Sequence, residues 1–128
     1  MRELFSPKSL PAPKFRYTPC VKAGPFYQMA GLIGLDPVSG QLKAKGPYEE
    51  AKQILANLTA AARDLGLALT DLVSVNIYTT RFDEFSAINR AWEEVFHPDL
   101  PPPARTSVGV AALPLGATVE IEARFYRP

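Results

Sequence analysis

Residues 48–97, YEEAKQILANLTAAARDLGLALTDLVSVNIYTTRFDEFSAINRAWEEVFH, contain none of the 13 prolines of this 128-residue chain. Proline inside a helix removes a backbone hydrogen bond and clashes with the preceding turn, so helix interiors avoid it. The prolines on either side of this stretch divide the rest of the chain into short segments. We therefore predict the helices within residues 48–97.

Two amphipathic helices are predicted in this stretch. The first covers residues 48–65 and ends at Gly66, and the second follows an N-cap at Asp83 and stops before His97–Pro98. In each, apolar residues recur at spacings of three and four, which places them on one helix face. They are Ala51, Ile54, Leu55, Leu58, Ala61, Ala62 and Leu65 in the first helix, and Phe85, Ile88, Trp92, Val95 and Phe96 in the second.

Strands are predicted around and between the helices because β-branched and alternating residues occur there. The first two strands are joined by a turn at Gly24–Pro25. The middle strand places Val73, Val75 and Ile77 on one face. The last strand alternates apolar residues with Glu120, Glu122, Arg124 and Tyr126. The five strands cover residues 17–22, 26–33, 72–79, 106–112 and 117–126.

This β-β-α-β-α-β-β order predicts one α+β domain over residues 1–128, with two helices on one face of a mixed sheet. The other face then needs its own cover. Residues 26–33 are nearly apolar on both faces, which is typical of a strand buried from both sides. We expect further copies of the chain to cover this face in a homo-oligomer. Cover by long side chains or by the N-terminal segment is the alternative.

Composition excludes several classes of protein. The chain is 47% hydrophobic and carries a net charge of +1, with Lys and Arg scattered, so we expect no nucleic-acid partner. No apolar run approaches the roughly 20 residues that cross a bilayer. The opening residues lack the apolar core of a secretory signal, and the single Cys20 cannot form an internal disulfide. A cytoplasmic protein without a membrane partner is expected.

The side-chain inventory also limits the chemistry. With one histidine and one cysteine, no ligand pair has the spacing of a metal site. His97 is the only base for a serine or cysteine nucleophile, and before a proline at a helix end it is expected to cap or to face solvent. Phosphate-binding glycine loops are absent. We expect no metal and no nucleotide cofactor.

Four residues remain as candidates for function. Arg105 follows three prolines, and a fixed guanidinium suits a carboxylate held by two hydrogen bonds; the alternative is a surface ion pair. Glu120 and Glu122 share the face opposite the apolar residues, where a half-buried carboxylate at a subunit interface could act as a base; a solvated face is the alternative. Asn89 lies on the apolar side of its helix, where its amide either forms hydrogen bonds within the core or contacts a ligand.

Three segments together resemble one known family. They are GLIGLDPVSGQL (residues 31–42), DEFSAINRAWEEVF (residues 83–96) and PPARTSVGVAALPLGATVEIEA (residues 102–123). They closely resemble the RidA/YjgF family of small imine deaminases, and the resemblance extends from about Tyr17 to the end of the chain. It implies a chorismate-mutase-like fold in which three subunits pack their sheets into a central barrel. It places three sites in the clefts between neighbouring subunits.

The resemblance also implies the roles of individual residues. Arg105 would hold the carboxylate of a 2-imino acid, and Glu120 would position or activate the attacking water. Tyr17, Gly31 and Asn89 match further site positions of the family. The implied reaction is hydrolysis of imines or enamines released by pyridoxal-phosphate enzymes, which gives a 2-keto acid and ammonia without a cofactor.

The chain departs from the family pattern at several site positions. The family has Gly-Pro-Tyr where this chain has Phe15-Arg16-Tyr17, and a small hydroxyl residue at the position of Ala30. Ser107, expected to contact substrate, stands where cysteine is frequent, and Gly34 stands where proline is common. Because a hydroxyl is lost and a cation is gained, we expect substrate choice to differ from that for short-chain imino acids.

Three other functions are weighed against the imine deaminase. The first is a different carbon–nitrogen hydrolase that uses Arg105 and Glu120, and the second is a non-catalytic trimer that binds small metabolites or proteins. The third, an endoribonuclease or translation inhibitor, is ascribed to some relatives. RNA cleavage needs acid and base groups near a basic, aromatic path, and the single histidine and scattered cations argue against it.

Overall fold

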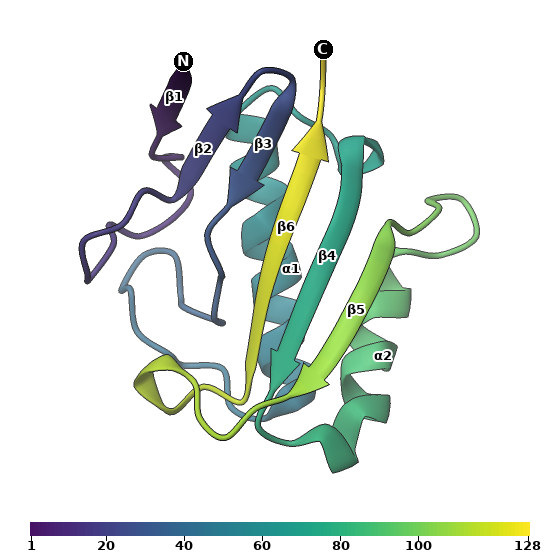
Figure 1. Cartoon of the computed structure of the whole chain (residues 1–128). Helices are drawn as coiled ribbons and strands as arrows, with labels where there is room; N and C mark the ends of the chain where they lie inside the picture. Colours follow the sequence, from purple (N-terminus) through teal and green to yellow (C-terminus); the bar gives the residue numbers. More distant parts are fainter.

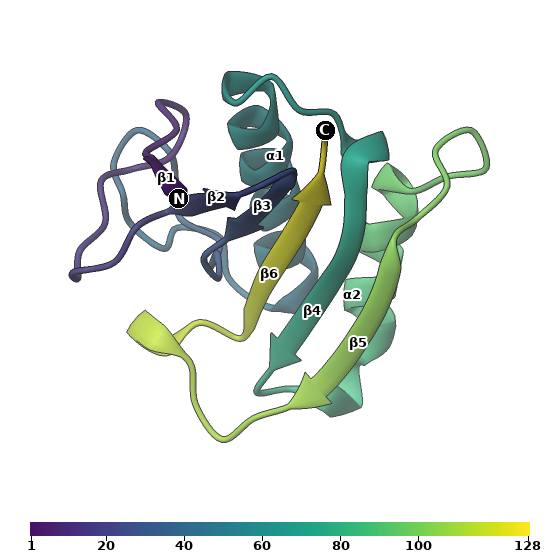
Figure 2. The same cartoon turned by 45° about the horizontal axis from the view of Figure 1, so that its top comes forward.

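The computed structural model describes all 128 residues, as one six-stranded sheet with two α-helices on one face (Figures 1 and 2). The strand order is β1-β2-β3-β6-β4-β5, and only β4 and β5 pair in parallel. The predicted fold class is therefore confirmed. The elements are β1 (Arg2–Phe5), β2 (Cys20–Ala23), β3 (Phe26–Met29), α1 (Pro47–Asp64), β4 (Leu72–Thr79), α2 (Phe85–Val95), β5 (Ala104–Gly109) and β6 (Val119–Tyr126).

Helix α1 confirms both the predicted apolar face and the predicted end. Its apolar residues are buried except for the half-buried Leu65. Gly66 has φ +73°, and its N–H donates to the Arg63 carbonyl at 3.1 Å, while the Leu67 N–H donates to the Ala62 carbonyl at 2.8 Å. This pair of hydrogen bonds closes a helix C-terminus on a left-handed residue.

Helix α2 begins differently from the prediction. The N-cap is Glu84, without a side-chain capping bond, so the predicted cap at Asp83 is wrong. Asp83 instead lies in a 3-10 turn, Phe82–Glu84, which leads directly into the helix. Trp92 and Phe96 are buried on the predicted face, with ring centroids 4.4 Å apart.

Strand β4 contains a second difference. Val73 was expected on one face with Val75 and Ile77, but those two residues are buried whereas Val73 is 44% exposed, and Leu72 is buried instead. The pairing with β6 shifts register between Leu72 and Ser74. Because an extra residue reverses which side chains face the core, the irregularity turns Val73 outward.

The sheet edges also differ from the prediction. Strand β1 was not predicted. It pairs antiparallel with β2, and an ion pair joins the two strands, with Nζ of Lys22 3.5 Å from Oε2 of Glu3. The predicted strand 26–33 is regular only to Met29, after which Leu32 forms an isolated bridge with Ile121. Strand β5 starts and stops earlier than the predicted residues 106–112.

The face of the sheet away from the helices has no cover within one chain (Figure 2). Met29 is buried on the helix side, whereas Phe26, Val108 and Tyr126 remain 40–43% exposed. Neither side chains nor the N-terminal segment cover these residues, so burial of strand 26–33 on its second side remains a prediction for the homo-oligomer. No helix is long and apolar enough to cross a membrane.

We expect Gly66→Ala to lower the free energy of unfolding by about 1 kcal/mol, because a side chain disfavours the left-handed backbone. A Cβ atom there meets nothing within 4 Å, so only the backbone is strained. Gly109→Ala is the control, since its Cβ would lie 3.5 Å from Phe82 at ordinary contact distance. Urea denaturation at one protein concentration should lower the midpoint for Gly66→Ala alone; equal midpoints would contradict this helix end.

Candidate active site

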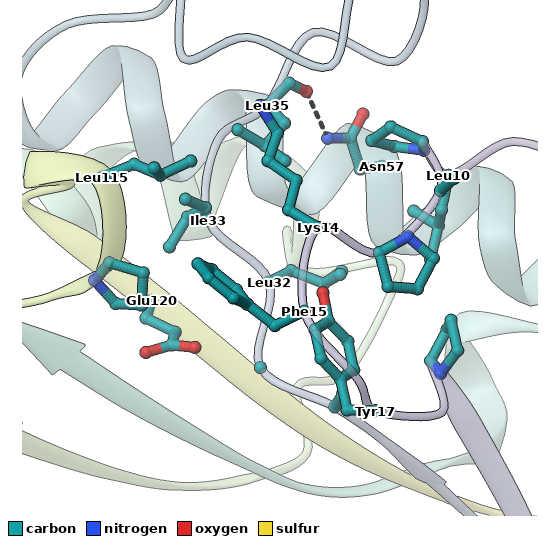
Figure 3. A pocket seen from close by; sticks show the side chains of 17 residues that line it. Leu10, Lys14, Phe15, Tyr17, Leu32, Ile33, Leu35, Asn57, Leu115 and Glu120 are labelled. Carbon is teal, nitrogen blue, oxygen red and sulfur yellow. Dashed lines mark hydrogen bonds between the residues drawn. The ribbon is translucent and has the colours of Figure 1, made fainter.

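A pocket of about 230 Å³ lies between the N-terminal segment, residues 30–35 and the start of β6 (Figure 3). Three of the predicted site residues, Tyr17, Gly31 and Glu120, line it. They come from three separate parts of the chain, so the fold brings them together. Ala30 also lines the pocket, at the position where the family pattern has a small hydroxyl residue.

The approach of Gly31 to Glu120 is set by the backbone. Leu32 and Ile121 exchange two hydrogen bonds, with N–O distances of 2.8 and 2.9 Å. This antiparallel bridge places Gly31 and Glu120 at diagonal positions, and the Glu120 side chain reaches across to Gly31. A Cβ atom at position 31 would lie 2.3 Å from Oε2 of Glu120, so a side chain there would displace the end of the Glu120 side chain.

The start of β6 is held by a buried carboxylate. Glu50 of α1 is 1% exposed, and it accepts hydrogen bonds from the backbone N–H and the hydroxyl of Thr118, both at 2.8 Å. It also accepts the Gly46 N–H at 2.9 Å. Because a buried charge needs such partners, this contact fixes β6 two residues before Glu120.

Glu120 and Glu122 have different electrostatic environments. Burial, and then the negative charge of Glu122, raise the pKa of Glu120 above its usual value. Glu122 accepts hydrogen bonds from the Tyr78 hydroxyl at 2.5 Å and from Nδ2 of Asn76 at 2.8 Å, and these lower its pKa. When the pKa values of two neighbouring carboxyl groups shift in opposite directions, one group can act as the acid or base while the other stays ionised. Glu120, whose pKa is raised, is the group suited to proton transfer.

Arg105 lies on the other face of the sheet from Glu120. It pairs in register with the buried Val75, and its guanidinium stacks over Phe85 at 5.4 Å and Trp92 at 5.0 Å. None of the three salt bridges includes Arg105, so the alternative of a surface ion pair within the chain is wrong. The stacking fixes a free guanidinium beside α2.

A second hollow contains Arg105 and the half-buried Asn89. Ser107 is on the same face of β5 as Arg105, in register with Ile77, but lines neither hollow. A single chain therefore joins Tyr17, Gly31 and Glu120 in one place and Arg105 with Asn89 in another.

The pocket also contains residues that the sequence analysis missed. Asn57 is 5% exposed, and Figure 3 shows it on the opposite side of the pocket from Glu120. Its position between Ile54 and Ala61, at helical spacing within the apolar face, was a usable signal. Lys14 and Leu115, also in the lining, lie in irregular segments that gave no such signal.

Two reactive side chains lie outside the pocket. His97 is exposed, and its Nδ1 accepts the Asp99 N–H at 3.3 Å, which confirms the predicted capping or solvated role. Cys20 is buried and unpaired, and burial raises the pKa of its thiol to about 11. A thiol with that pKa is protonated at neutral pH and is a poor nucleophile.

Comparison with known proteins identifies the family and its fold. The family model described as Endoribonuclease L-PSP matches residues 7–125, nearly the whole chain. The chain belongs to this family, the RidA/YjgF family. A solved structure described as RidA from the Antarctic bacterium Psychrobacter sp. superposes with a TM-score of 0.89 at 32% identity, over 97% of this chain and 98% of that one. The chorismate-mutase-like fold implied by the resemblance is thus confirmed.

RidA/YjgF relatives carry different descriptions. The chain is 36% identical over 123 residues to a 2-iminobutanoate/2-iminopropanoate deaminase of Capra hircus, covering 96% of this chain and 88% of the relative. It is 38% identical over 122 residues to a RutC family protein of Aquifex aeolicus, covering 95% and 96%. Membership of the family therefore narrows the function without fixing the substrate.

We expect Glu122→Gln to lower the pKa of Glu120, because the substitution removes the nearby negative charge and keeps the side-chain shape. Burial continues to hold that pKa above its usual value. NMR titration of the glutamate carboxyl carbons measures the shift, with Glu3→Gln in β1 as the control. An unchanged Glu120 titration would show that the two carboxylates are not coupled.

Proposed function

We propose that the protein hydrolyses 2-imino acids to 2-keto acids and ammonia. The observation that carries this proposal is the half-buried Glu120 carboxylate, held against Gly31 in a pocket and with a raised pKa. The deaminase description of relatives at 36% identity supports the same reaction. In the overall step, R–C(=NH)–COO⁻ and water become R–C(=O)–COO⁻ and ammonia.

Glu120 is proposed to move the proton in this reaction. Its carboxylate takes a proton from water as the water oxygen bonds to the imine carbon, which gives a carbinolamine. That proton passes to the former imine nitrogen and completes the carbinolamine. Glu120 then takes the proton of the new hydroxyl group and delivers it to the same nitrogen, so that the carbon–oxygen double bond forms, the carbon–nitrogen bond breaks and ammonia leaves. Only protons are transferred, so orientation and one proton acceptor suffice, and no cofactor is proposed.

Arg105 is proposed to hold the substrate carboxylate from a neighbouring subunit. Within one chain it lies across the sheet from Glu120, stacked on Phe85 and Trp92 and free of any ion pair. A guanidinium binds a carboxylate through two parallel hydrogen bonds. We propose a homotrimer whose packing of the uncovered sheet faces sets Arg105, Asn89 and Ser107 of one subunit opposite the pocket of the next.

Neither hollow is lined by histidine, which argues against RNA cleavage by this chain. A cytoplasmic location is proposed, where the single unpaired Cys20 remains reduced. A non-catalytic metabolite-binding trimer is the competing function.

The deaminase is tested with 2-iminobutanoate generated in place by a threonine dehydratase. We expect the protein to accelerate its decay, and Arg105→Ala to lower kcat/KM by about 100-fold through the loss of two charge-assisted hydrogen bonds. Glu120→Gln should also lower kcat. Equal decay with wild type and with Arg105→Ala would favour the metabolite-binding function, and RNA loss that depends on Arg105 would favour a nuclease.

Mixing the two variants tests whether the site is shared. When Arg105→Ala and Glu120→Gln subunits assemble at random, about one quarter of shared sites contain both native residues. Activity should therefore return on mixing. If mixed assemblies form, as native mass spectrometry can show, and activity does not return, Arg105 and Glu120 do not act together across subunits.

We expect Gly31→Ala to lower kcat/KM by about 100-fold while the fold survives, because the added methyl group displaces the flexible end of Glu120. Gly34→Ala is the matched comparison. Its Cβ would lie 3.0 Å from the backbone oxygen of Glu50, which cannot move as easily, so thermal stability should fall instead. Full activity of Gly31→Ala would contradict the role of Glu120 in the reaction.

A further inference from the structure

We infer that the pocket beside Glu120 receives the side chain of the substrate, and that Leu115 selects 2-imino acids with apolar side chains larger than ethyl. This inference rests on the proposed deaminase function and names the substrate class of the same site. Leu115 has no role in the proposed proton transfer.

The size and lining of the pocket favour an apolar group. A single water needs about 10–15 Å³ of such space, and this pocket offers about 230 Å³. Nine of its 17 lining residues are hydrophobic, among them Phe15, Leu32, Leu35 and Leu115. Figure 3 shows Phe15 and Leu32 between Glu120 and the far side of the pocket. A methyl group would leave most of this space unfilled.

The polar group on the far side of the pocket, the Asn57 amide, already has hydrogen-bond partners within the protein. Nδ2 of Asn57 donates to the Leu35 carbonyl at 2.8 Å, and Oδ1 of Asn57 accepts from Nε2 of Gln53 at 2.9 Å. Because these bonds orient the amide toward the protein, the far wall does not require a polar ligand. An isobutyl or larger apolar side chain therefore suits this end.

Leu115 has the one backbone conformation in the chain that its side chain disfavours. It has φ +57° and is the only residue other than glycine with positive φ. It lies in the 3-10 turn Pro114–Gly116, where the Ala117 N–H donates to the Pro114 carbonyl at 3.1 Å. Glycine or asparagine would fit this backbone better.

The Leu115 side chain gains little from the core, because it is 51% exposed. It lines the pocket on the same side as Glu120 (Figure 3). A bulky side chain at a strained and exposed position that lines a pocket indicates a role at the site. We assign it contact with the apolar part of the substrate.

Lys14 provides the competing assignment. It is exposed, lines the same pocket and belongs to none of the three salt bridges. Its apolar stem can cover the pocket wall while the ammonium group stays in water. An acidic substrate side chain would instead bind the ammonium group, so the experiment includes one.

The test compares imines that amino-acid oxidases generate from leucine, alanine and glutamate. We expect kcat/KM for the leucine-derived imine to exceed that for the alanine-derived imine by about tenfold. Leu115→Gly and Leu115→Asn should each lower this ratio by about tenfold without lowering the thermal midpoint, and Leu115→Met should preserve it. Val38→Gly, at a 95% exposed position outside the pocket, is the control and should leave the ratio unchanged.

A ratio near one, or a ratio that Leu115→Gly does not change, would overturn the inference. Fastest hydrolysis of the glutamate-derived imine would also overturn it and assign the pocket to Lys14. Calorimetric binding of 4-methyl-2-oxopentanoate and of pyruvate separates the two proposals. If the protein accelerates the hydrolysis of no imine, but 4-methyl-2-oxopentanoate binds more tightly than pyruvate and Leu115→Gly removes the difference, the deaminase proposal fails and the subsite stands. If the protein accelerates no hydrolysis and binds both keto acids equally, both proposals fail.

Discussion

The register of β6 is the constraint on which both the core and the candidate site depend. Val119, Ile121, Ala123 and Phe125 face the helices, and Glu120 and Glu122 face the opposite side. Side chains alternate along a strand, so a shift of one residue would expose the core and bury both carboxylates. Two contacts at the start of the strand prevent such a shift: the hydrogen bonds of Glu50 with Thr118 and the bridge between Leu32 and Ile121. The same contacts that stabilise the fold therefore position Glu120.

Periodicity predicted the elements that bury a regular face. Helix α1, helix α2 and strand β6 have long runs in which spacing alone identifies the buried side, and each was confirmed. The failures have local causes. Val73 is turned outward by a register shift, and a 3-10 turn displaces the start of α2 from Asp83. Strand β1 has four residues at a sheet edge, too few for a pattern, and its place depends on pairing with β2.

The candidate site was only partly accessible to sequence reasoning. Arg105 and Glu120 stood out because a proline run and an alternating strand restrict their directions, and the family resemblance grouped them with Tyr17 and Gly31. No local pattern could show that Arg105 and Glu120 lie on opposite faces of one sheet, since that follows from the parallel pairing of β4 with β5. Leu115 lies outside every periodic segment, and its left-handed backbone depends on the 3-10 turn Pro114–Gly116.

The contact between Gly31 and the Glu120 carboxylate has an evolutionary consequence. Because an added Cβ atom would lie 2.3 Å from the Glu120 carboxylate, a larger residue at position 31 forces the end of that side chain to move. A lineage that acquires a side chain at position 31 therefore also changes where the acid at position 120 lies. The two sites are therefore epistatic, and their histories of substitution should be linked although 89 positions separate them in the chain.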